Sequence, residues 1–125
     1  MPVAQKVLAP ARDKTLTKAT VRAAQLLDLT QADLAPILGV SESTVSRMAR
    51  GEYELSPEQK AWELAALFVR VFRSLDALVG SNPTQAHAWL NSENTALGSV
   101  PRTLITRTEG LVRVLQYLDA ARGRA

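Results

Sequence analysis

Apolar residues recur at helical spacing along most of the chain, and strict alternation of apolar and polar residues appears over no useful length. This pattern predicts an all-α fold. Residues 1–16 mix proline, alanine and charge without a clear period, so we expect a flexible N-terminal tail there. Thr17 is expected to cap a first helix that runs to about Asp28.

Capping residues and helix breakers divide the rest of the chain into further helices. The predicted helices span residues 31–38, 42–50, 57–79, 83–90 and 108–122. The residues expected at their starts are Thr30, Ser41, Ser56, Asn82 and Thr108. Residues 91–99 are polar and contain a glycine, so they are expected to form a loop, and Pro101 is expected to open one helical turn.

Residues 30–51 contain two short amphipathic helices joined by a tight turn. Gly39 stands where the chain reverses and where a left-handed conformation is favoured. Ala35 is small at the point where the two helices must cross closely. This spacing predicts a helix-turn-helix within a domain over residues 17–56. Pro36 lies inside the first helix, where it removes a hydrogen bond at a cost of about 3 kcal/mol and predicts a kink.

The outer face of the second short helix is polar, with arginines toward its end. Such a face suits the DNA major groove, where arginine bonds guanine and Ser or Thr bonds several base edges. Residues 1–51 carry seven basic and four acidic side chains, a net charge of +3, whereas residues 52–92 have a net charge of −2. The alternative is an ordinary helical hairpin with a solvated outer face. The predicted DNA contacts are Gln31, Ser43, Thr44, Arg47 and Arg50.

Residues 57–80 form a predicted long connecting helix with two apolar seams. One seam contains Phe68 and Phe72, and the other contains Leu64 and Val71. Two seams mean two buried faces. Either the chain's own helices cover both, or one seam meets a second copy of the chain in a homodimer.

The composition excludes several classes of protein. The 125 residues include no cysteine and one histidine, so thiolate metal sites, multi-histidine zinc sites and cysteine nucleophiles are excluded. His87 is expected to be a surface or hydrogen-bonded residue. No apolar run approaches a membrane span, and the N-terminus lacks the pattern of a signal peptide, so we expect a cytoplasmic protein without a membrane partner.

The C-terminal part, residues 81–125, carries a specific combination of residues. A Trp-Leu pair is followed by an Asn-x-Ala-Leu-Gly loop, a proline, and a Thr-Glu-Gly sequence ahead of the last helix. With the helix-turn-helix before it, this part resembles the Xre/MbcA/ParS-type antitoxins, which pair an Xre-like helix-turn-helix with a small helical toxin-binding domain. The residues that carry the resemblance are Trp89, Leu90, Asn94, Ala96, Leu97, Gly98, Pro101, Thr108, Glu109 and Gly110.

The resemblance implies a partner and a function. The partner in that family is a RES-domain toxin that consumes NAD; the antitoxin blocks it by direct binding and represses its own promoter. The chain is then expected to be no enzyme, to bind no cofactor, and to bind operator DNA as a homodimer. The expected toxin contacts lie on the last helix and its tail: Leu111, Val114, Leu118, Arg122, Arg124 and Ala125.

Two points stay open at this stage. The tail at residues 122–125 either places an anion where the pyrophosphate of NAD would sit in the toxin cleft, or it is frayed. The whole chain is either an antitoxin, a free-standing transcription factor of phage-repressor type whose C-terminal half serves dimerisation, or a protein-binding adaptor that no longer reads DNA.

Overall fold

The computed structural model describes the backbone of residues 2–123 and the side chains of residues 14–123. Within this part, regular secondary structure consists of helices and one isolated antiparallel bridge between Asn94 and Ser99. The predicted all-α class is therefore confirmed. In chain order, the helices are α1 Pro2–Leu26, α2 Gln31–Leu38, α3 Glu42–Ala49, α4 Lys60–Leu78, α5 Pro83–Asn91, α6 Pro101–Leu104 and α7 Thr108–Gly123.

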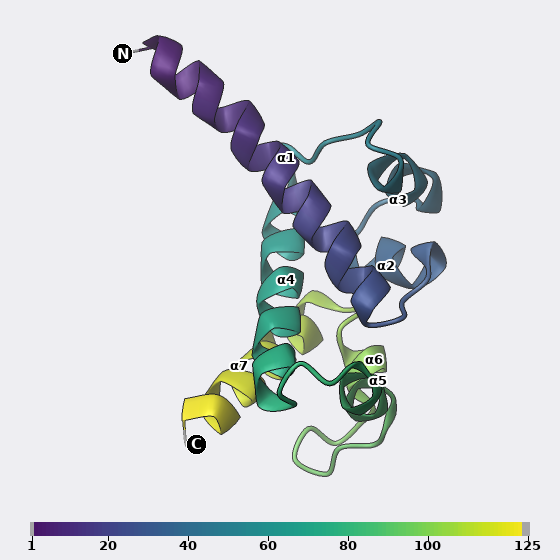
Figure 1. Cartoon of the computed structure of the whole chain (residues 1–125). Coiled ribbons are helices and arrows are strands. Elements are labelled where there is room, and N and C mark those ends of the chain that lie inside the picture. Colours follow the sequence, from purple (N-terminus) through teal and green to yellow (C-terminus); the bar gives the residue numbers. More distant parts are fainter. Residues whose placement is uncertain (1, 124–125) are drawn as a thin grey trace.

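Helix α4 stands at the centre of the molecule, with α1 to α3 around its upper part and α5 to α7 around its lower part (Figure 1). It contacts α1, α2, α5 and α7. Phe68, Val71 and Leu75 on this helix are completely buried, while Phe72 is only partly buried. The chain's own helices therefore cover most of both predicted seams, as expected for a central helix within one chain.

The start of α1 corrects the sequence interpretation. The predicted tail over residues 1–16 gives way to helix from Pro2, and Thr17 lies inside α1 rather than at its start. A proline is tolerated in the first turn of a helix, because the N–H groups of that turn have no acceptor within the helix. Thr17 instead is buried, and its Oγ1 accepts a hydrogen bond from the Leu55 N–H at 2.9 Å. It thus joins α1 to the segment that leads into α4.

The start of α4 also differs from the prediction. The helix begins at Lys60, with Gln59 at its N-cap, instead of directly after Ser56. The Gln59 side chain accepts a hydrogen bond from the Ser56 N–H at 2.9 Å, and the Gln59 N–H donates to the Ser56 carbonyl at 2.9 Å. Residues 56–59 therefore form a closed turn ahead of the helix.

The other predicted starts are confirmed. Thr30 and Ser41 accept hydrogen bonds from backbone N–H groups of the first turns of α2 and α3, and Asn82 does the same for α5. Pro36 lies inside α2 with its ring exposed, and the helix continues past it to Leu38. Among the helices of the described residues, none is long and apolar enough to cross a membrane.

Candidate functional site

The α2–α3 pair has the geometry that the spacing predicted. Gly39 adopts a left-handed conformation with φ of 70°, and its N–H donates to the Ala35 carbonyl, which ends α2. Ser41 then caps α3 by accepting from the Thr44 N–H at 3.1 Å. Val45 and Met48 are buried against the core. Because the inner face of α3 is fixed in this way, its polar residues face solvent.

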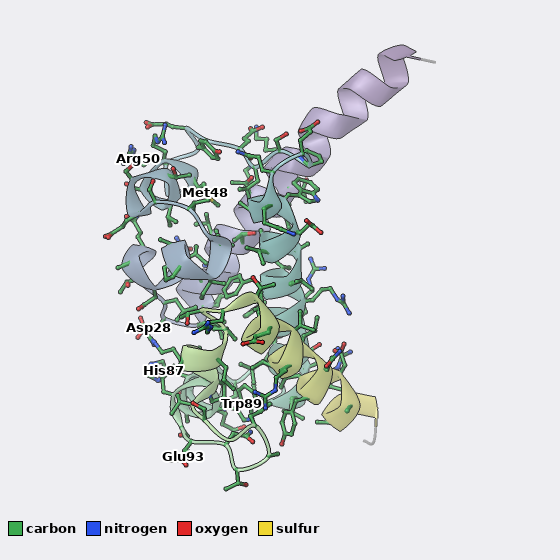
Figure 2. All side chains as sticks on the ribbon, turned by 180° about the vertical axis from the view of Figure 1, so that it is seen from behind. Asp28, Met48, Arg50, His87, Trp89 and Glu93 are labelled. Atoms are coloured by element: carbon green, nitrogen blue, oxygen red, sulfur yellow. The ribbon has the colours of Figure 1, made fainter. Side chains whose placement is uncertain are left out.

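The predicted DNA-contact residues lie together on one surface. A shallow hollow of about 530 Å³ runs across the N-terminus of α2 and the outer face of α3. Figure 2 shows Arg50 at the outer edge of α3, with Met48 turned toward the core. The hollow is lined by Gln31, Glu42, Ser43, Ser46, Arg47 and Arg50. Thr44 does not line it, but its Oγ1 accepts a hydrogen bond from Arg47 at 3.2 Å.

Arg47 is held in place by an aromatic residue that the sequence analysis missed. Its guanidinium carbon lies 5.4 Å from the centre of the Tyr53 ring. A cation over an aromatic face is attracted by the ring quadrupole. With the bond to Thr44, this contact restricts Arg47 before any partner arrives. The only sequence signal was an aromatic residue shortly after the glycine that ends the hairpin.

Arg50 is paired within the protein. It bonds the Ser46 Oγ at 2.6 Å and forms an exposed ion pair with Glu52 at 3.1 Å. Exposed pairs contribute about 0–1 kcal/mol, so a phosphate can replace Glu52 at small cost. Glu52 itself is exposed to solvent.

The residues that carry the family resemblance build a fixed corner between α5 and α7. Trp89 and Tyr117 stack with ring centres 6.2 Å apart. Asn94 closes the loop after α5, because its side chain accepts from the Leu97 N–H at 3.0 Å and its carbonyl accepts from the Gly98 N–H at 2.8 Å. Arg113 on α7 then donates to the Leu97 carbonyl at 2.9 Å. These residues therefore shape the surface of the C-terminal part.

The proposed toxin contacts on α7 divide into three groups. Leu111, Val114 and Leu118 are completely buried, so in this structure they are scaffold and not contact residues. This corrects the prediction for those three positions. Arg122 is exposed at the end of α7. Arg124 and Ala125 lie outside the described residues.

Arg122 belongs to a basic hollow between α4 and α7, which we call the arginine hollow. It has a volume of about 670 Å³ and is lined by Arg70, Arg73, Ser74, Asp119, Arg122 and Gly123. Asp119 accepts from Ser74 at 2.6 Å and lies 3.5 Å from Arg70 and 3.9 Å from Arg122. Three arginines and one aspartate line the hollow, so it has a net positive charge and suits an acidic surface.

A second, less polar hollow lies beside Trp89, between the end of α4 and α5. Its volume is about 380 Å³, and its lining includes Val79 from the end of α4 and Ala88, Trp89 and Glu93 around α5. Figure 2 shows Trp89 and Glu93 at the same end of the molecule. Partly exposed aromatic residues of this kind are enriched at protein interfaces.

Two family models match the chain. The antitoxin Xre-like helix-turn-helix domain matches residues 6–70, and the antitoxin Xre/MbcA/ParS C-terminal toxin-binding domain matches residues 74–124. A comparison with curated proteins finds no match. The first match contains the α2–α3 hollow, and the second contains the Trp89 corner and most of the arginine hollow. The chain, with its DNA-binding type of hairpin and its toxin-binding region, therefore belongs to the Xre/MbcA/ParS antitoxins.

Proposed function

We propose that this antitoxin binds and occludes a RES-domain toxin that degrades NAD, and that it represses its own operon through α3. The observation that carries the proposal is the presence of two separate surfaces on one chain. The α2–α3 hollow lies in the region matched by the helix-turn-helix model, and the arginine hollow lies mostly in the region matched by the toxin-binding model.

DNA binding is assigned to five residues of the hairpin. In this proposal Arg47 bonds a guanine in the major groove, with Ser43 and Thr44 beside it. Gln31 at the N-terminus of α2 and Arg50 at the end of α3 contact the backbone phosphates. The support is the hollow, which all of these residues except Thr44 line, and the restrained position of Arg47 over Tyr53.

A homodimer completes the DNA-binding proposal. Helix-turn-helix proteins of this kind read two half-sites about 34 Å apart, one on each protomer. A single α3 of eight residues reaches only a few base pairs, so specificity requires a second copy. The partly buried Phe72 and the exposed Leu78 on α4 are apolar side chains that a second copy can cover.

Toxin binding is assigned to the surfaces around α7. The arginine hollow, including Arg122, faces acidic groups at the rim of the toxin cleft, and the Trp89 hollow supplies apolar contact area. Arg124 and Ala125, which follow in the sequence, are included in the proposal as further toxin contacts. Leu111, Val114 and Leu118 contribute indirectly, because they hold α7 against α4.

The test uses the full-length antitoxin with the RES-domain toxin encoded beside it. We expect the two proteins to co-purify, NAD loss in the toxin-producing cells to stop, and the promoter DNA of the operon to shift in a gel. Antitoxin that shifts the DNA but neither captures the toxin nor protects NAD would instead be a free-standing transcription factor. Antitoxin that captures the toxin but shifts no promoter DNA would be an adaptor without autorepression.

A further inference from the structure

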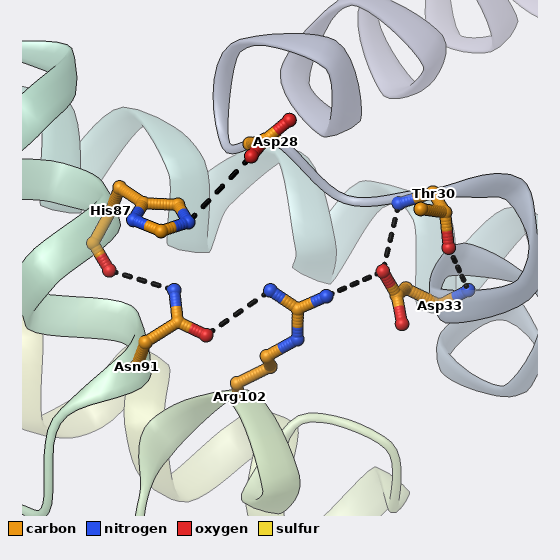
Figure 3. Close-up of polar contacts among 6 residues, drawn as sticks. All are labelled: Asp28, Thr30, Asp33, His87, Asn91 and Arg102. Carbon is orange, nitrogen blue, oxygen red and sulfur yellow. Dashed lines mark hydrogen bonds and ion pairs between the residues drawn. The ribbon is translucent and has the colours of Figure 1, made fainter.

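A partly buried polar contact between Arg102 and Asp33 links the two functional halves (Figure 3). Arg102, in the first turn of α6, has a side chain that is 30% exposed. Its Nη2 donates to the Asp33 Oδ2 of α2 at 2.5 Å, and its Nη1 donates to the Asn91 Oδ1 at the end of α5 at 3.1 Å. The Asn91 amide in turn donates to the His87 carbonyl at 2.8 Å. Arg102 is therefore fixed at both ends of its guanidinium.

Asp33 is the residue that organises the start of α2. Its Oδ2 accepts from the Thr30 N–H at 2.8 Å, while the Thr30 Oγ1 accepts from the Asp33 N–H at 3.1 Å. This reciprocal pair is a capping box. Arg102 binds the same carboxylate oxygen that closes the box. The pKa of Asp33 is held below its usual value, first by the hydrogen bond from the Thr30 backbone and further by Arg102.

The position of the capping box links it to DNA binding. Gln31 directly follows Thr30 and lines the α2–α3 hollow. The buried side of α2 packs on α3, so the orientation of α2 also sets the orientation of the recognition helix. A second contact between the halves, His87 Nε2 to Asp28 Oδ2 at 3.7 Å, is more exposed on both sides. Exposed pairs contribute little, so Arg102 is the stronger link.

We infer that Arg102 is a positioning residue for DNA binding: from the toxin-binding half, it holds the capping box of α2 and thereby orients Gln31 and α3 toward the operator. The inference rests on the proposed DNA-binding function. Arg102 does not line the α2–α3 hollow, so its effect passes through Asp33 rather than through a contact with DNA.

The test compares operator affinity and its salt dependence for the full chain and four variants. These are Arg102→Ala, Arg102→Lys, Asp33→Asn, and the Arg102→Ala/Asp33→Asn double variant. Arg107→Ala is the matched control, because it removes the same charge from an exposed residue shortly after α6. Thermal unfolding and toxin capture, measured on each variant, show whether the protein is folded and whether the toxin-binding half is intact.

We expect Arg102→Ala to weaken operator binding about fivefold, at the low end of coupling between sites. The salt dependence of binding should stay that of the wild type, because no cationic contact with a phosphate is lost. The double variant should lose no more operator affinity than the single variant with the larger loss, since both substitutions remove the same contact. Arg102→Lys keeps the positive charge but lacks the planar guanidinium, so its operator affinity should lie between those of the wild type and Arg102→Ala. In NMR spectra, the chemical shifts of the Thr30 and Gln31 backbone amides should change in Arg102→Ala and remain those of the wild type in Arg107→Ala.

Several results would overturn the inference. Operator affinity unchanged in a folded Arg102→Ala protein, or a loss equal to that of Arg107→Ala, removes the positioning role. A lower salt slope in Arg102→Ala would indicate that Arg102 contacts a phosphate directly. Fully additive losses of affinity in the double variant would show that Arg102 and Asp33 act independently. If the wild-type chain binds no operator at all, the proposed DNA-binding function itself fails, and the role of Arg102 fails with it.

Discussion

Gly110 lies so close to the backbone of Leu104 that no side chain fits between them. A Cβ atom at Gly110 would lie 2.0 Å from the Leu104 carbonyl oxygen and 2.7 Å from its carbonyl carbon. The contact occurs where α6 crosses the start of α7. The glycine of the Thr-Glu-Gly sequence therefore permits α6, and with it Arg102, to sit directly against α7.

Gly110→Ala should destabilise the protein by about 1–3 kcal/mol, the usual cost of forcing extra atoms into a packed site. The loss should occur although alanine is the better helix former. Urea unfolding measures it. Gly123→Ala is the control, because a Cβ there meets nothing within 4 Å. That change should leave stability equal or slightly higher, and equal stability of both variants would contradict the close approach.

Thr17→Val should cost about 1–3 kcal/mol, because it leaves the buried Leu55 N–H without its hydrogen-bond acceptor. Thr20→Val is a matched control in the same helix. The Thr20 hydroxyl is also buried, but it donates to the Leu16 carbonyl four residues earlier. Such a back bond adds little to a helix, so its loss should cost less than that of Thr17. If urea unfolding shows equal losses of stability for the two variants, the hydrogen bond between Thr17 and Leu55 adds no stability beyond that of an ordinary buried hydroxyl.

The two arginines of α3 should have different effects on operator binding. Arg47→Ala should relax sequence preference, with a loss of about 1–3 kcal/mol of discrimination at one base pair. Arg50→Ala should weaken binding to all sequences and reduce the salt slope by about one. Glu52→Gln should act in the opposite direction, because it releases Arg50 from its ion pair. Gel shifts with operator and scrambled DNA at several salt concentrations measure all three, and an unchanged footprint for Arg47→Ala rules out its groove contact.

The capping box makes stability depend on pH in a defined direction. The pKa of Asp33 is lowered in the folded protein, chiefly by the Thr30 backbone bond. Its carboxylate therefore stabilises the fold above the unfolded pKa of about 3.9, and this contribution is lost as the pH falls through the lower folded pKa. Asp33→Asn should be less stable than wild type at pH 7, and the difference should shrink below about pH 4. A constant difference in urea unfolding from pH 7 to about pH 3 would contradict this linkage.

Charge reversal in the arginine hollow should weaken toxin binding. We expect Arg73→Glu to lower toxin affinity by about tenfold or more, because it places a negative charge opposite an acidic rim. Calorimetric titration of toxin into antitoxin measures the change. Lys60→Glu is the control, since Lys60 is exposed at the other end of α4, about 20 Å away at 1.5 Å per residue. Equal losses in both variants would point to a general charge effect.

Local sequence signals predicted the hairpin and most helix starts. Thr30, Ser41 and Asn82 each act on a backbone N–H within three residues, so the sequence alone contains the information. The contacts that the sequence analysis missed join residues far apart in the chain. Such contacts form only once the helices have packed, and no periodicity in the sequence predicts them. Examples are Arg102 with Asp33 and Thr17 with Leu55.

The same reasoning explains the error on α7. A stripe of leucines on an amphipathic helix shows that one face is buried, but it does not reveal what covers that face. Leu111 and Leu118 are buried within the chain, where a partner cannot reach them. We propose instead that the toxin contacts residues at the edges of the helices, such as Trp89 on α5 and Arg73 on α4.

The boundary between the two matched regions falls inside α4, between residues 70 and 74. The helix-turn-helix domain and the toxin-binding domain therefore share one continuous helix and cannot be exchanged as independent units. A chain cut at this point leaves each fragment with a bare strip of buried residues, including Phe68 on one side and Leu75 on the other. A different helix-turn-helix domain can be fused to this toxin-binding domain only if its last helix continues α4 in the same helical phase across residues 70–74.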